Sequence, residues 1–152
     1  MSSKQKAALV VPAKLNCHKL QRLAEAKIEE SRILLQYKHW TGAYYEAGLA
    51  VECALKARLS RAIQQYDFPY KKFVDKAYTH DLEDLVELDP ALSTELRNEM
   101  SRDDKLESNW KTASSWDDEK RYELVEESEA RSLFDAITEP SCGVMDWIRR
   151  RW

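Results

Sequence analysis

The strongest constraint on the fold is a row of alanines in the segment 43–65. The alanines recur every three or four residues, at Ala43, Ala47, Ala50, Ala54 and Ala57. On an α-helix this spacing aligns them along one face, where a neighbouring helix can approach closely. Larger apolar side chains flank the row, namely Tyr44, Val51 and Leu55 on one side and Tyr45, Leu49, Leu59 and Ile63 on the other. A helix that is apolar nearly all round is typical of the centre of a helical domain.

The composition favours the same fold class. The chain has 152 residues, which is typical of one domain with one core, and 43% of them are hydrophobic. It contains only three glycines and four prolines, too few for the turns of a small all-β protein. No apolar run approaches the ~20 residues that span a bilayer. We therefore predict an all-α protein, an up-and-down bundle of four to five helices.

The boundaries of the elements follow from local signals. Residues 1–13 are expected to form a flexible N-terminal arm, and residues 14–152 a single helical domain. Apolar periodicity and capping signals predict helices near residues 14–37, 43–65, 90–101, 120–138 and 144–152, with a short helix after Thr79 as its N-cap. Asp89-Pro90 is a typical helix start. Loops are expected at 67–78, which Pro69 interrupts, and at 102–120, which is mostly polar.

The cysteines and histidines give no sign of a metal or disulfide framework. The three cysteines are odd in number and far apart, and the three histidines lack the spacing of metal ligands. The apolar stretch at residues 7–11 is too short for a secretory signal. Because free cysteines fit a reducing compartment, we expect a cytoplasmic protein. No glycine-rich phosphate loop is present, and we expect neither a metal nor a cofactor.

Charge is unevenly distributed along the chain. The net charge is −3, yet the first 38 residues carry +5 and residues 73–139 carry −12. Such asymmetry can build a local positive field on an acidic protein. We expect basic residues of the first helix and the C-terminal tail to rim a cleft for a nucleotide or RNA: Lys27, Arg32, Lys38, Arg149, Arg150 and Arg151. The alternative is that these residues only form solvent-exposed faces of helices and bind no ligand.

Several local strings resemble the HEPN (higher eukaryote and prokaryote nucleotide-binding) superfamily. The most specific is GAYYEAGLAVECALKA at residues 42–57, followed by YTHDL at 78–82. Trp110, Trp116 with Arg121-Tyr122, and GVMDWI at 143–148 complete the resemblance, which extends from about residue 15 to the end. It implies a helical bundle that usually dimerises and associates with nucleotides or RNA. Many members act in bacterial toxin–antitoxin or defence systems beside a nucleotidyltransferase.

The sequence departs from the family pattern at the catalytic motif. Catalytic HEPN proteins cut RNA without a metal, using an Arg and then, after four to six residues, a His near the start of the last long helix. No histidine follows His80, so Arg121 lacks that partner. The spacing recurs at Arg32 and His39, in the wrong helix. The weak catalytic candidates are therefore Arg32 with His39, or Arg121 with His80.

Other residues have both a structural and a functional interpretation. Glu52 and Lys56 are spaced i, i+4 on the apolar helix, and we interpret them as a structural polar pair because burying charge is costly. His80 can contact a ligand or act as a base, or it can hydrogen-bond across the bundle. Aromatic rings can stack nucleobases or pack loops onto the bundle; the candidates are Trp110, Trp116, Trp147 and Trp152.

These observations lead to one main functional hypothesis. We expect a HEPN homodimer that binds a nucleotide, RNA or a partner protein and catalyses no reaction. The alternatives are a divergent metal-independent endoribonuclease and a structural partner of a nucleotidyltransferase or antitoxin. A lone subunit would leave the alanine row exposed, so we expect an isologous dimer interface formed by the first or the last long helix, with Trp147 and Trp152 as candidates.

Overall fold

The computed structural model describes residues 16–63, 68 and 70–152, and the predicted arm at 1–13 lies outside them. The described residues form helices and no strand, which confirms the all-α class. The helices are α1 (Cys17–Gln36), α2 (Trp40–Ala62), α3 (Lys71–Ala77), α4 (Leu82–Glu87), α5 (Pro90–Met100), α6 (Asp104–Ser114), the 3-10 helix η1 (Asp118–Tyr122), α7 (Glu127–Thr138) and α8 (Val144–Arg149). None of these helices is long and apolar enough to cross a membrane.

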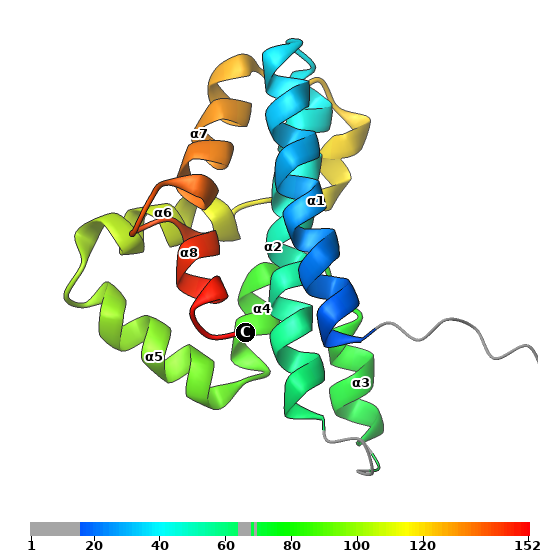
Figure 1. Cartoon of the computed structure of the whole chain (residues 1–152), viewed down its shortest axis with the longest axis vertical. Coiled ribbons are helices and arrows are strands. Elements are labelled where there is room, and N and C mark those ends of the chain that lie inside the picture. The colour runs from blue at the N-terminus through cyan, green and yellow to red at the C-terminus, as the bar shows by residue number, and fades with distance from the viewer. Residues whose placement is uncertain (1–15, 64–67, 69) are drawn as a thin grey trace, which may run out of the picture.

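Helices α1 and α2 form a long antiparallel pair that runs along the molecule (Figure 1). All five alanines of the row are completely buried, as the sequence predicts. The hydroxyl of Ser31 on α1 donates a 2.7 Å hydrogen bond to the carbonyl oxygen of Ala43 on α2, which ties the two helices at close range. Because one chain already buries the row, the row provides no surface for a second copy. That argument for a dimer is wrong.

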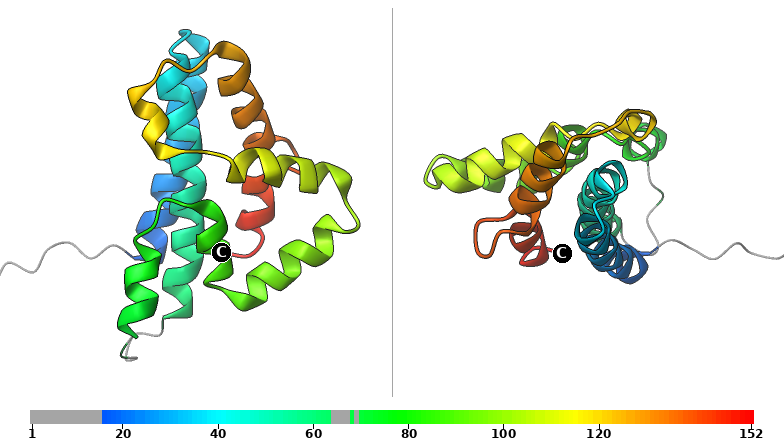
Figure 2. Two further views of the ribbon diagram at one scale, coloured as in Figure 1. Left: turned by 180° about the vertical axis from the view of Figure 1, so that it is seen from behind. Right: turned by 90° about the horizontal axis from the view of Figure 1, so that it is seen from above.

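The remaining helices extend the core on one side of this pair. Figure 2 shows α5, α6, α7 and α8 grouped beside α1 and α2, whereas α3 lies near the C-terminal end of α2. Trp116, which follows α6, packs flat against α2 at Gly48, where a Cβ would come within 2.1 Å of indole atoms. Glycine is required at that position because any side chain would collide with the ring.

The bundle has more helices than the four to five predicted, because both expected loops contain one. Helix α3 lies within 67–78, where Phe73, Val74 and Ala77 form a short apolar face. Helix α6 lies within 102–120, where Asp103 caps the first turn and three apolar side chains are buried, namely Leu106, Trp110 and Ala113. Their spacing of four and three is helical. It is difficult to recognise among so many polar residues.

Helix starts follow the predicted capping chemistry in one case and depart from it in two. Asp89 caps α5, accepting from the Leu92 N–H at 3.1 Å, with Pro90 in the first turn, as predicted. Helix α4 is capped by Asp81 rather than by Thr79, whose hydroxyl accepts instead from the Asp81 N–H. Helix α7 begins at Glu127 rather than near Lys120, because residues 118–122 form η1.

The tryptophans are mostly core residues. Trp110, Trp116 and Trp147 are buried, and two of them donate their indole N–H to a carboxylate, Trp110 to Glu83 at 3.1 Å and Trp147 to Glu99 at 2.6 Å. These three rings are therefore not free to stack on a base. The burial of Trp147 also excludes it as a dimer contact, and of the four candidate tryptophans only Trp152 is partly exposed.

Candidate functional site

The predicted polar pair on α2 is present and includes a third member. The ammonium of Lys56 donates to Oε1 of Glu52 at 2.8 Å, and Nδ1 of His80 lies 2.9 Å from Oε2 of the same carboxylate. Glu52 is only 4% exposed, whereas His80, in the loop between α3 and α4, exposes 55% of its side chain. The buried carboxylate thus joins the central helix to the α3–α4 loop.

This arrangement fixes how the His80 ring is oriented. An ionised carboxylate only accepts hydrogen bonds, so Nδ1 carries the proton in the contact with Glu52. Nε2 is then the nitrogen that can accept a proton or a hydrogen bond from solvent or a ligand. A carboxylate that orients an imidazole in this way is a recurrent arrangement in proton transfer. The geometry is also sufficient for a purely structural cross-link.

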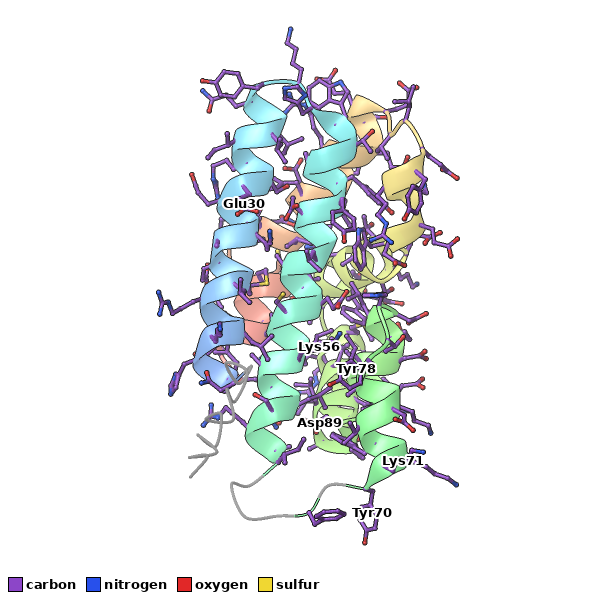
Figure 3. All side chains as sticks on the ribbon, turned by 90° about the vertical axis from the view of Figure 1, so that its right-hand side faces the viewer. Glu30, Lys56, Tyr70, Lys71, Tyr78 and Asp89 are labelled. Carbon is purple, nitrogen blue, oxygen red and sulfur yellow. The ribbon has the colours of Figure 1, made fainter. Side chains whose placement is uncertain are left out.

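A basic and aromatic surface lies at the same end of α2. Lys71, Lys72 and Lys76 lie on α3 and Arg61 on the last turn of α2, and all four are exposed. Tyr70, just before α3, is 85% exposed, and Tyr78, just after it, is 79% exposed. Figure 3 shows Tyr70 and Lys71 at the tip of the molecule. We call these six residues the α3 end.

The cations of the α3 end have acidic neighbours on one side, where Asp75 of α3 and Asp84 and Glu87 of α4 line a hollow together with Lys76 and Tyr78. Residues 56–78 contain six Lys or Arg against two Asp, and two of these cations, Lys56 and Arg58, are paired with Glu52 and Asp89. Within the part of the chain that the structure describes, the four cations of the α3 end form no ion pair. Helix α3 is amphipathic, with Phe73, Val74 and Ala77 packed toward α2 and its lysines outward. The result is a local positive surface.

The cations that the sequence predicts for a cleft are mostly paired. Lys27 lies 2.8 Å from Glu30 and 3.0 Å from Glu46, and its pKa is raised, first by the hydrogen bond to Glu30. Arg32 lies 3.3 Å from Glu29, with its guanidinium 5.4 Å from the centre of the Phe134 ring. These contacts offset the positive charge of α1.

The C-terminal tail is neutralised in the same way. Arg149 binds Glu25 at 2.7 and 2.8 Å and Asp146 at 2.9 Å. Arg151 binds Glu95 at 2.6 Å, also contacts Glu99, and covers the face of Trp147 at 4.1 Å. Of the six predicted cations, Lys38 and Arg150 are exposed without an acidic partner among the described residues. The expected basic cleft is therefore not formed by the tail arginines, because carboxylates of α1 and α5 hold two of them.

The structure does not assemble the catalytic pairs either. Arg121 donates to the Tyr45 hydroxyl at 3.4 Å, whereas His80 bonds to Glu52, seven residues farther along α2. At ~1.5 Å per residue these positions are about 10 Å apart along the helix. Arg32 is held by Glu29 and Phe134, and His39 is an exposed residue at the start of α2 with no bond to Arg32 in the described part of the chain.

The α3 end was missed by the sequence interpretation, although the sequence contains a signal for it. The string Tyr70-Lys71-Lys72-Phe73 places two lysines between two aromatic residues, and aromatic and basic residues together are typical of surfaces that bind single-stranded nucleic acids. No cluster of His, Cys, Asp or Glu that could hold a metal ion occurs among the residues that the structure describes. Neither a family model, nor a curated protein, nor a solved structure matches the chain.

Proposed function

We propose that this chain is a nucleotide- or RNA-binding module of the HEPN type, that its ligand binds at the α3 end, and that it catalyses no reaction of its own. The observation that carries the proposal is the α3 end itself, where two highly exposed tyrosines flank a helix with three exposed lysines. A phosphate-bearing chain would place its phosphates near the lysines and its bases on the aromatic rings.

Two interactions would contribute to binding: the attraction between charges and the stacking of aromatic rings on bases. Lysines attract the phosphate backbone, with an affinity that falls as salt rises. A base that stacks on an aromatic side chain gains ~1–3 kcal/mol without depending strongly on its identity. Tyr70 and Tyr78 are exposed at 85% and 79%, far more than the buried tryptophans. Their rings are therefore available for this role.

The HEPN assignment is supported by the way its two most specific strings meet. His80, from the string at 78–82, contacts the carboxylate of Glu52, from the string at 42–57, at 2.9 Å. Lys56, in the same α2 string, bonds to the other oxygen of that carboxylate. On this basis we propose a cytoplasmic protein of a toxin–antitoxin or defence system that works beside an antitoxin or a nucleotidyltransferase.

The proposal is tested by binding of a labelled single-stranded RNA at two salt concentrations. The variant with both Lys71→Glu and Lys72→Glu should bind about tenfold more weakly or worse, with a smaller salt dependence than the wild type. The matched control carries Lys38→Glu and Arg150→Glu, the same change in charge at two cations of the predicted cleft. Equal losses in the two variants, or no binding by the wild type, would contradict the proposal.

A homodimer remains part of the proposal, but with an interface other than the one expected at Trp147 and Trp152. Ile33 on α1 and Tyr37, the residue that caps the C-terminus of α1, are exposed large hydrophobic residues and could pack against the same pair in a twofold mate. Light scattering at micromolar concentration should give about twice the chain mass of 17.8 kDa. The variant Ile33→Asp should return it to one chain mass, and a monomeric wild type would remove the dimer from the proposal.

One observation favours an enzyme as the second candidate. The contact of Nδ1 of His80 with Glu52 leaves Nε2 free to take the proton of an RNA 2′-hydroxyl. The 2′-oxygen would then attack the adjacent phosphorus, the bond from phosphorus to the 5′-oxygen would break, and the leaving 5′-oxygen would take a proton from water. Cleavage of RNA in EDTA that disappears in His80→Ala and persists in His39→Ala would establish this activity. Equal cleavage by both variants would remove His80 as the base.

A further inference from the structure

An apolar pocket of about 240 Å³ lies beside the α3 end, between the start of α1, the last turns of α2 and the inner face of α3. Its walls include Leu59 of α2 and Phe73, Val74 and Ala77 of α3. Lys56 and Tyr78 also line it, and Figure 3 shows these two residues next to each other. The pocket therefore connects the Glu52–Lys56–His80 contacts with the exposed tyrosine.

The size of the pocket limits what it can hold. Pockets for drug-sized ligands measure ~300–1,000 Å³, and this one is smaller. Its apolar walls favour a group with two apolar faces, and its volume suits one ring system rather than a sugar, a phosphate and a base together. A polar backbone would have to remain outside, on the side where the cations of the α3 end are exposed.

Lys56 places hydrogen-bond donors on one wall of the pocket. An ammonium has three donors, and Lys56 directs one of them to Oε1 of Glu52 at 2.8 Å. The side chain remains 21% exposed, so its other donors can reach an acceptor on the edge of a ring. Among nucleobases, guanine presents two neighbouring acceptors, O6 and N7, and lysine is one of the side chains that recognise them. Adenine presents a donor in place of O6.

We infer that this pocket holds the base of the bound nucleotide, with a preference for guanine, and that Lys56 contacts the acceptor edge of the base. The inference rests on the proposed function, because it deepens the ligand chemistry of the α3 end. The phosphate then lies outside the pocket near the lysines of α3, and the ring of Tyr78 covers the exposed part of the base. Charge complementarity at the rim favours a nucleotide over an apolar side chain of a protein partner.

The direct test follows the methyl resonances of Val74 by NMR while guanosine monophosphate, adenosine monophosphate or ribose 5-phosphate is added to the wild-type chain. Guanosine monophosphate should shift these methyls and bind about fivefold or more tightly than adenosine monophosphate, as expected for one good base contact. Ribose 5-phosphate, which has no base, should leave the Val74 methyls unchanged.

A variant that fills the pocket provides the second readout. Ala77→Phe should remove the advantage of guanosine monophosphate over ribose 5-phosphate, whereas the same substitution at the exposed Ala26 of α1 should preserve it. Lys56→Gln should reduce the preference for guanine over adenine. Circular dichroism establishes that each variant is folded, and the Val74 experiment decides the question without any variant.

The results separate this inference from the proposed function. If RNA and ribose 5-phosphate bind but Val74 does not respond to either nucleotide, the base pocket is wrong and phosphate binding at the α3 end stands. If a phenylalanine-containing peptide shifts Val74 and guanosine monophosphate does not, the pocket belongs to a protein partner and the inference is overturned. If wild-type chain binds no RNA and no nucleotide, the proposed function fails as well.

Discussion

Two basic regions of this chain differ in what surrounds them. The C-terminal tail has three consecutive arginines, and two of them are held by carboxylates from distant helices. The α3 end has a similar density of positive charge, but its cations have no ion-pair partner among the described residues. Clustered charge in a sequence therefore does not by itself indicate a binding surface. We therefore expect the tail arginines to stabilise the fold, whereas the cations of the α3 end are exposed.

The largest effect on stability is expected for Arg151→Ala. The Arg151 side chain is only 17% exposed, and it contacts Glu95, Glu99, the Trp147 carbonyl and the Trp147 ring. Losing charged hydrogen bonds and packing should lower the free energy of unfolding by about 2 kcal/mol in urea denaturation. RNA binding should not change once the variant is folded.

The adjacent Arg150 provides the control. It is exposed and reaches only the Ser141 carbonyl, at 3.3 Å, so Arg150→Ala should change stability by less than ~0.5 kcal/mol. Similar losses for Arg150→Ala and Arg151→Ala would show that the contacts of Arg151 do not stabilise the fold.

A smaller effect on stability is expected when two of the three lysines of α3 are reversed in charge. Lys71 and Lys72 are exposed and make no ion pair with a described residue, so Lys71→Glu with Lys72→Glu should alter the free energy of unfolding by less than ~1 kcal/mol. The loss of RNA affinity expected for this variant would then have no structural origin. A large loss of stability would mean that these lysines resemble the tail arginines.

Acid should weaken the tail contacts selectively. The pKa of Asp146 is lowered, first by the hydrogen bond from the Ser141 N–H and then by Arg149. A lowered pKa means that Asp146 stabilises the fold above its ordinary pKa of ~3.9 and loses this contribution as the pH falls through the lower folded value. Because the Asp146 side chain is 38% exposed, solvent screens its contacts and the effect should be small.

The comparison of wild type with Asp146→Asn measures this contribution. Unfolding free energies at pH 7 should be higher for the wild type, and the difference should shrink as the pH drops below ~3.9. A difference that is constant from pH 7 to pH 2 would show that the charge of Asp146 is not responsible.

The smallest change in stability is expected for a substitution of Lys38. Lys38 lies in the turn between α1 and α2 with a φ of 63°, fully outside the helices. Its replacement by Gly should not weaken RNA binding and should raise stability by about 0.5 kcal/mol, because glycine adopts positive φ without strain. A loss of RNA affinity in Lys38→Gly would indicate that RNA binds at the cleft predicted from the sequence and not at the α3 end.

What the sequence predicts correctly depends on signals between near neighbours. The alanine row, the Glu52–Lys56 pair and the start of α5 at Asp89-Pro90 are all spacings of a few residues. Helices α3 and α6 were missed because each offers only three apolar positions, in seven and eleven residues. Short apolar patterns of this kind are not distinguishable from loops by periodicity.

The ion-pair partners of the charged residues could not be predicted from the sequence, for another reason. Arg149 and Glu25 are 124 residues apart in the sequence, and His80 and Glu52 are 28 apart. No local spacing specifies such contacts, because the packing of whole helices brings them together. The candidate site could therefore be predicted in part, through Glu52, Lys56 and His80. The α3 end and the neutralised tail required the three-dimensional structure.

The most direct test of the account is photochemical cross-linking of the wild-type chain to a single-stranded RNA that contains 4-thiouridine, followed by mass spectrometry of the peptides. The α3 end combines exposed aromatic rings with unpaired lysines. We therefore expect adducts in the peptides that contain Tyr70 and Tyr78, and their loss in the variant with Lys71→Glu and Lys72→Glu. Adducts confined to the tail at Trp152 or to the turn at Tyr37, or the absence of any adduct, would contradict the account.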